Sequence, residues 1–108
     1  MSSTLSPLEF GILQLVASEN WPGFRVDRLR ARDRQNTGAG RYTYIDDDLG
    51  QQLTDGIYTA QGRMIDMEGV RNGLAFLVDV SGSRINSIEI AVYGNESWDG
   101  TERAWRIV

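Results

Sequence analysis

The feature that most constrains the fold is a near-continuous apolar run, Leu74–Val80, followed by the turn Ser81–Ser83 and a second β-favouring segment, Arg84–Tyr93. In the second segment, isoleucine and valine alternate with Glu89 and Ala91, as the two faces of a strand require. An apolar run of this length is typical of a strand that is buried on both faces or lies at the centre of a sheet. The two segments therefore predict a β-hairpin inside the sheet.

Near the N-terminus, the sequence carries the start signals of a helix. Ser6 is suited to the N-cap, Pro7 to the first helical position, and Glu9 to the third, where it closes a capping box. The helix is expected to run to about Ser18 and to end before Pro22, because proline disfavours helical geometry in the residue before it. Its apolar stripe is formed by Leu8, Ile12, Leu15 and Val16, widened by Phe10, Leu13 and Ala17.

Other segments predict shorter elements. Phe24–Arg32 is rich in helix formers and predicts a short second helix. Alternation and β-favouring residues predict strands at Arg41–Ile45, at Gly56–Gln61 with Gly62–Met67 as one bent strand or two short ones, and at Arg103–Val108 as an edge.

This order of elements, helices first and strands after, indicates one α+β domain over residues 1–108. We expect the N-terminal helix, with the short second helix, to pack on an antiparallel sheet of about four or five strands. The chain has 108 residues and no cysteine, so packing alone has to stabilise it. No segment approaches the roughly 20 apolar residues of a membrane span, and a cytoplasmic location is expected.

Three residue types are missing. All 11 basic residues are arginine, and the chain contains no lysine, histidine or cysteine. Mechanisms that need an imidazole base, a lysine Schiff base, a thiolate or a histidine-bound zinc are therefore excluded.

Asp46, Asp47 and Asp48 form the obvious candidate for a metal site, because calcium prefers clustered carboxylates. The spacing argues against such a site. An EF-hand loop that starts at Asp46 requires glutamate at its twelfth position, where the chain has Ile57. We expect a solvated loop, and no metal or cofactor.

Two further groups have alternative interpretations. Asp66, Glu68, Asp79 and Glu89 lie on or beside strands expected to be neighbours, so they could supply a general acid and base, although such residues more often line a solvated face. The five arginines between Arg25 and Arg34 could contact phosphates, but the net charge of -4 argues against nucleic-acid binding.

The half of the chain that forms most of the sheet is acidic. Residues 46–108 contain 11 acidic residues and five arginines, a balance of -6. An acidic surface that carries tyrosine and tryptophan is suited to steering a basic protein partner and holding it. The candidate partner-binding residues are Asp46, Asp47, Asp48, Tyr58, Asp66, Glu68, Glu89, Tyr93 and Trp98.

Four segments together resemble a family of small uncharacterised bacterial proteins: Leu5–Glu9, Asp66–Gly69, Val78–Ile90 and Tyr93–Gly94. The family shares an opening helix and a closing hairpin, and some of its members occur in toxin–immunity settings, including contact-dependent growth inhibition. The resemblance implies an immunity role and no catalytic residue. From Ser97 onward the chain departs from the family pattern.

We therefore expect a non-enzymatic interaction protein, such as a cytosolic immunity protein that occludes the active site of a basic toxin domain. The alternative is a small-ligand-binding or carboxylate-dependent enzymatic domain with a pocket between helix and sheet. The oligomeric state is left open, because an exposed edge strand could also pair with a second copy.

Overall fold

The computed structural model describes residues 2–47 and 52–108. Its helix α1 (Pro7–Asn20) begins as the sequence predicts. The hydroxyl of Ser6 accepts a hydrogen bond from the Glu9 amide at 3.1 Å, and the Glu9 carboxylate accepts one from the Ser6 amide at 2.8 Å. The predicted capping box is therefore confirmed, and the helix ends two residues later than expected.

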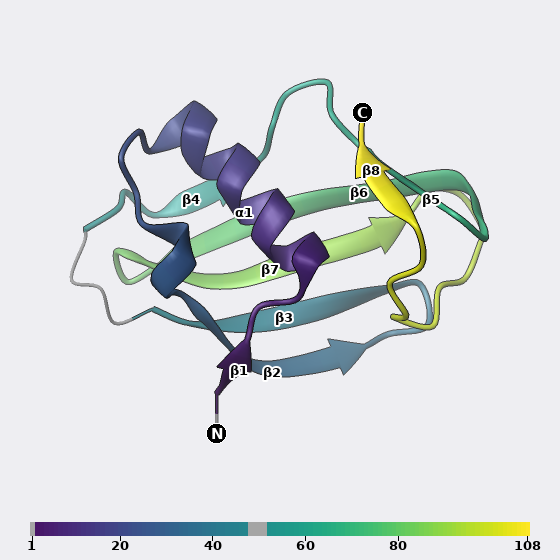
Figure 1. Cartoon of the computed structure of the whole chain (residues 1–108), viewed down its shortest axis with the longest axis horizontal. Coiled ribbons are helices and arrows are strands. Elements are labelled where there is room, and N and C mark those ends of the chain that lie inside the picture. The colour runs from purple at the N-terminus through teal and green to yellow at the C-terminus, as the bar shows by residue number, and fades with distance from the viewer. Residues whose placement is uncertain (1, 48–51) are drawn as a thin grey trace.

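The described residues form one antiparallel sheet of eight strands, in the order β1-β2-β3-β7-β6-β5-β8, in which β4 pairs with the end of β6 opposite to the one that pairs with β5 (Figure 1). The strands are β1 (Ser3–Thr4), β2 (Arg30–Asn36), β3 (Gly40–Asp46), β4 (Gly56–Tyr58), β5 (Ile65–Met67), β6 (Val70–Ser81), β7 (Arg84–Val92) and β8 (Trp105–Ile107). The predicted hairpin is the β6–β7 pair, whose turn places Gly82 and Ser83 at φ 64° and 67°. Two positive φ angles give a tight turn the twist that the flanking strands need.

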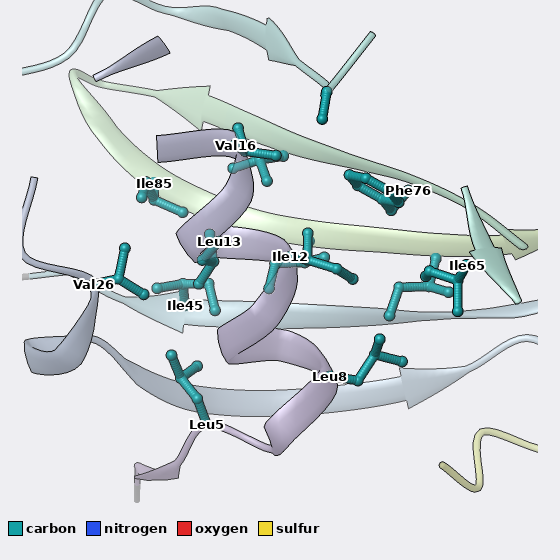
Figure 2. Close-up of a cluster of buried hydrophobic side chains, with 14 of the residues drawn as sticks. Leu5, Leu8, Ile12, Leu13, Val16, Val26, Ile45, Ile65, Phe76 and Ile85 are labelled. Carbon is teal, nitrogen blue, oxygen red and sulfur yellow. The ribbon is translucent and has the colours of Figure 1, made fainter. Parts of the chain in front are cut away.

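The hydrophobic core lies between α1 and one face of the sheet (Figure 2). Leu8, Ile12, Leu13 and Val16 of the helix are buried and face the strands. At the far end of the sheet, β8 also contacts α1, where the Trp105 ring lies against Gly11. Helix α1 thus covers one face of the sheet, and no helix of the described residues covers the other face, which we call the open face.

The predicted fold class is wrong in two respects. The described residues form eight strands instead of four or five, because β1 and β2 were not expected and the segment Gly56–Met67 forms two separate strands, β4 and β5. The second helix, predicted over Phe24–Arg32, is reduced to the 3-10 turn Val26–Arg28. From Arg30 the chain is strand β2, which pairs with β3 at six positions, so cross-strand pairing overrides helix propensity.

Candidate functional site

A buried carboxylate lies where α1 meets the sheet. Glu9 has no exposed surface, and three side chains donate hydrogen bonds to it. Arg34 of β2 donates two, at 2.7 and 2.8 Å, while Arg41 and Thr43 of β3 donate at 3.1 and 2.7 Å. Together with the Ser6 amide, these donors surround both carboxylate oxygens.

A second carboxylate, Glu102, joins the C-terminal segment to this group. Arg41 bridges the two acids, with its Nη2 atom 2.7 Å from Glu102 and 3.1 Å from Glu9. Arg41 also donates to the Gly100 carbonyl at 2.9 Å and lies over the ring of buried Trp98, 5.3 Å from its centroid. We call Glu9, Arg34, Arg41, Thr43 and Glu102 the buried charge cluster.

The chemistry of the buried charge cluster suits a structural role. Burial alone would raise the pKa of Glu9, but hydrogen bonds from Arg34, Ser6 and Thr43 and the charge of Arg34 lower it from 4.5 to about 2. A carboxylate with this pKa is a weak base, and Glu9 and Arg41 are 0% and 6% exposed. The two glutamates therefore make a poor acid–base pair for a substrate, and they hold helix, sheet and C-terminal segment together.

The open face of the sheet carries the second group of residues. Because β3 alternates, Arg41 and Thr43 point to the helix while Tyr42 and Tyr44 point away from it. Tyr42 is opposite Glu89 of β7, which is opposite Leu77 of β6. In the next row, Tyr44 is opposite Ser87 of β7. Ser87 is opposite Asp79 of β6, and Asp79 is opposite Ile57 of β4. We call Tyr42, Tyr44, Ile57, Leu77, Asp79 and Glu89 the outer patch.

Apolar and acidic groups meet in the outer patch. Ile57 is 61% exposed, and Leu77 and both tyrosines are half-buried. Asp79 accepts hydrogen bonds from Ser81 and Asn86, and Glu89 accepts one from the Tyr42 hydroxyl at 3.3 Å. Within residues 2–47 and 52–108, neither acid forms an ion pair with an arginine. The patch therefore keeps two carboxylates that no arginine of the described residues neutralises in an ion pair.

The charge of Glu89 also changes the pKa of the neighbouring Tyr42. This charge, and the hydrogen bond that Glu89 accepts, raise the pKa of Tyr42 above its usual 10.0. We expect Glu89→Gln to lower the pKa of Tyr42 toward the usual value, because the neutral amide no longer disfavours the phenolate. NMR titration of tyrosine ring carbons would measure this change. Asp66→Asn, on β5, should leave the pKa of Tyr42 where it is; equal shifts in both variants would contradict the assignment.

The structure separates the residues predicted to bind a partner. Glu89 is in the outer patch, and Asp46 is exposed at the end of β3 on the same face. Asp66 is on β5, where it pairs with Arg106 at 3.3 Å, and Glu68 is exposed in the turn after it. Tyr93 is 43% exposed, just past β7. Asp48 lies outside the described residues.

Three predicted partner-binding residues are directed inward. Trp98 is 2% exposed and donates through its ring nitrogen to the Thr101 carbonyl, so its side chain is not available as a surface anchor. Asp47 is buried and accepts a hydrogen bond from the Ile85 amide at 3.0 Å. Tyr58 packs edge-on against Trp21, 4.8 Å between centroids, on the helix side. Burial removes Trp98 and Asp47 from the candidate surface, and Tyr58 is half-buried on the helix side.

The structure also bears on two other sites considered from the sequence, a metal site and a pocket between helix and sheet. Among the described residues, no three acidic side chains gather in the way a metal site requires. The space between α1 and the sheet is filled by the core side chains (Figure 2). A surface hollow of about 550 Å³ lies elsewhere, at Gly69–Asn72, where the Glu96 carboxylate accepts hydrogen bonds from two consecutive backbone amides.

Sequence reasoning missed the buried charge cluster and most of the outer patch. Two signals were present. Glu9 shares the helix face of Leu8, Ile12 and Val16, and Arg41 shares the strand face of Ile45 by its spacing of two. The partners of both residues come from distant parts of the chain, and no local pattern indicates them.

No protein-family model matches the chain, and the searches of curated proteins and of solved structures gave no significant match either. The resemblance to a bacterial immunity-related family therefore stays a prediction. Within the described residues, no helix is long and apolar enough to cross a membrane.

Proposed function

We propose that the chain is a cytoplasmic protein-binding domain that performs no reaction of its own and neutralises a basic partner protein by covering it, as an immunity protein covers a toxin. One observation carries the proposal: the outer patch combines tyrosine, leucine and isoleucine side chains with carboxylates on a sheet face that the helix leaves open.

The composition of the patch supports protein binding. Interface cores favour aromatic and apolar groups, and a few such residues carry most of the binding energy. Tyr42, Tyr44 and Leu77 lie in adjoining rows of a rigid sheet, so little conformational entropy is lost when a partner orders them. Asp79 and Glu89 supply negative charge beside them, which steers a basic partner and fixes its orientation.

The carboxylate-dependent alternative has less support. Glu9 and Glu102 are bridged by Arg41, and Glu9 is fully buried while Glu102 is half-buried. Asp79 and Glu89 lie on an open sheet face, where water would surround a substrate and weaken the electrostatic effects on which catalysis depends.

The test is affinity capture from the native host with two single variants as baits. Leu77→Arg places a charge in the outer patch, and Phe10→Arg places one on α1, where Phe10 is 40% exposed. We expect Leu77→Arg to lower the recovery of one basic protein at least tenfold, because a buried cation at the centre of an interface costs more than 1.4 kcal/mol. Phe10→Arg should recover it at the wild-type level.

Function is then measured on the purified pair. Stoichiometric wild-type protein should suppress the activity of the captured partner, and Leu77→Arg should not. Circular dichroism checks that both variants are folded. Capture that is insensitive to Leu77→Arg, or a partner whose activity is unaffected, would contradict the proposal.

A further inference from the structure

The chain itself places one guanidinium over a tyrosine of the outer patch. The Arg32 guanidinium lies over the Tyr44 ring, 5.9 Å from its centroid. The Tyr42 ring is nearly parallel to that of Tyr44, at 14°, with 6.3 Å between their centroids. The tyrosine rings on this strand are therefore oriented so that a planar cation can stack on them.

Tyr42 and Tyr44 differ in the residue that lies opposite each of them on β7. Glu89 is the cross-strand partner of Tyr42, whereas Ser87 is the partner of Tyr44. The Tyr42 hydroxyl contacts only one of the two Glu89 oxygens. Leu77, opposite Glu89 on β6, supplies apolar surface on the other side of the carboxylate.

We propose, resting on the protein-binding function above, that this part of the outer patch recognises an arginine side chain of the partner. The guanidinium donates to the Glu89 carboxylate and stacks on the Tyr42 ring, and the aliphatic part of the arginine packs on Leu77. Arginine suits the arrangement better than lysine, because its planar fork can pair with a carboxylate and stack on a ring at the same time.

The charges favour a protein ligand over single-stranded nucleic acid. Stacked aromatics beside Arg30 and Arg32 could accept bases and phosphates. However, Glu89 lies on β7, next to the strand of the tyrosines, and Asp79 lies on β6, the strand beyond it, and their negative charge repels a phosphate backbone that crosses the patch.

The test is an NMR titration of the isotope-labelled protein with blocked tripeptides Gly-Arg-Gly, Gly-Lys-Gly and Gly-citrulline-Gly. The arginine peptide should shift the amides of Tyr42, Leu77 and Glu89, and the neutral citrulline peptide should not. Bound arginine should also lower the pKa of Tyr42, a change that a purely structural Glu89 would not produce.

Glu89→Gln should weaken the binding of the arginine peptide about fivefold. Tyr42→Phe should keep the binding, Tyr42→Ala should lose it, and Glu19→Gln, an exposed carboxylate on α1, should match the wild type.

Each contrary result has a separate meaning. Equal shifts with arginine and citrulline, or binding that is unchanged in Glu89→Gln, would overturn the arginine site while leaving the capture result with Leu77→Arg intact. Tighter binding of oligothymidylate to the same amides would replace the proposal with nucleic-acid binding. A dimer that Glu89→Gln dissociates in light-scattering measurements would assign the site to a second copy and overturn the separate partner.

Discussion

Replacing Arg41 with methionine is expected to lower the free energy of unfolding by about 3–5 kcal/mol. Methionine keeps much of the apolar stem but removes the cation that lies between Glu9 and Glu102. The buried carboxylate of Glu9 and the partly buried carboxylate of Glu102 are then left without Arg41 between them, with Arg34 as the remaining arginine beside Glu9. Urea unfolding followed by circular dichroism would measure the loss.

Two comparisons isolate the cause. Arg106→Met removes an arginine that is 75% exposed and pairs with Asp66, and it should cost less than about 1 kcal/mol. Adding Glu102→Gln to Arg41→Met should recover part of the loss, because it removes the carboxylate whose ion pair with Arg41 is lost. If Arg41→Met cost no more than Arg106→Met, the cluster would contribute little to stability.

We expect acid to remove the contribution of Glu9 to the free energy of unfolding over a defined pH range. Its pKa is lowered from 4.5 to about 2 in the folded chain. A lowered pKa means that the folded state favours the ionised form, so the contribution is present in full above about pH 4.5 and is lost as the pH falls through about 2. The shift corresponds to roughly 3 kcal/mol.

Glu9→Gln resembles the protonated state and provides the measurement. At pH 7 the wild type should be more stable than this variant by roughly 3 kcal/mol, and the difference should shrink progressively below pH 4.5. Asp99→Asn is the matched control, because a hydrogen bond from Arg103 lowers the pKa of Asp99 on the exposed surface. The loss of stability in Asp99→Asn should be smaller than that in Glu9→Gln and should decrease in high salt. A Glu9 difference that is constant down to pH 2 would contradict the assignment.

Strand β3 links the buried charge cluster to the outer patch. Arg41 and Thr43 point toward α1, and Tyr42 and Tyr44 point to the open face. Because side chains alternate along a strand, a slip of one residue would exchange the two sets and bury the tyrosines. The contacts of Arg41 with Glu9 and Glu102 therefore also specify which side chains the open face presents.

The elements that the sequence predicted correctly depend on neighbouring residues. The capping box joins Ser6 and Glu9, which are three residues apart, and the β6–β7 hairpin needs only a two-residue turn between apolar segments. Strand β3 was also expected, from its alternation. These signals are local, so they can be found without knowledge of the rest of the chain.

The wrong predictions concern segments whose structure depends on residues far away in the sequence. Arg30–Asn36 contains good helix formers, yet it forms strand β2 because β3 offers a pairing edge after a short turn. Trp98 was expected at the surface, but it is buried against Arg41, 57 residues before it in the chain. Propensity is a weak guide where cross-strand pairing and packing supply larger free energies.

The sequence by itself determined the capped first helix, the central hairpin, the acidic balance and the lack of histidine, lysine and cysteine side chains. Only the tertiary structure decided the strand number, the burial of Glu9 and the joining of Tyr42, Leu77 and Glu89 into one patch. The reason is physical: caps and turns are closed by bonds between near neighbours, whereas a patch or a buried ion pair exists only after the register of distant strands is set.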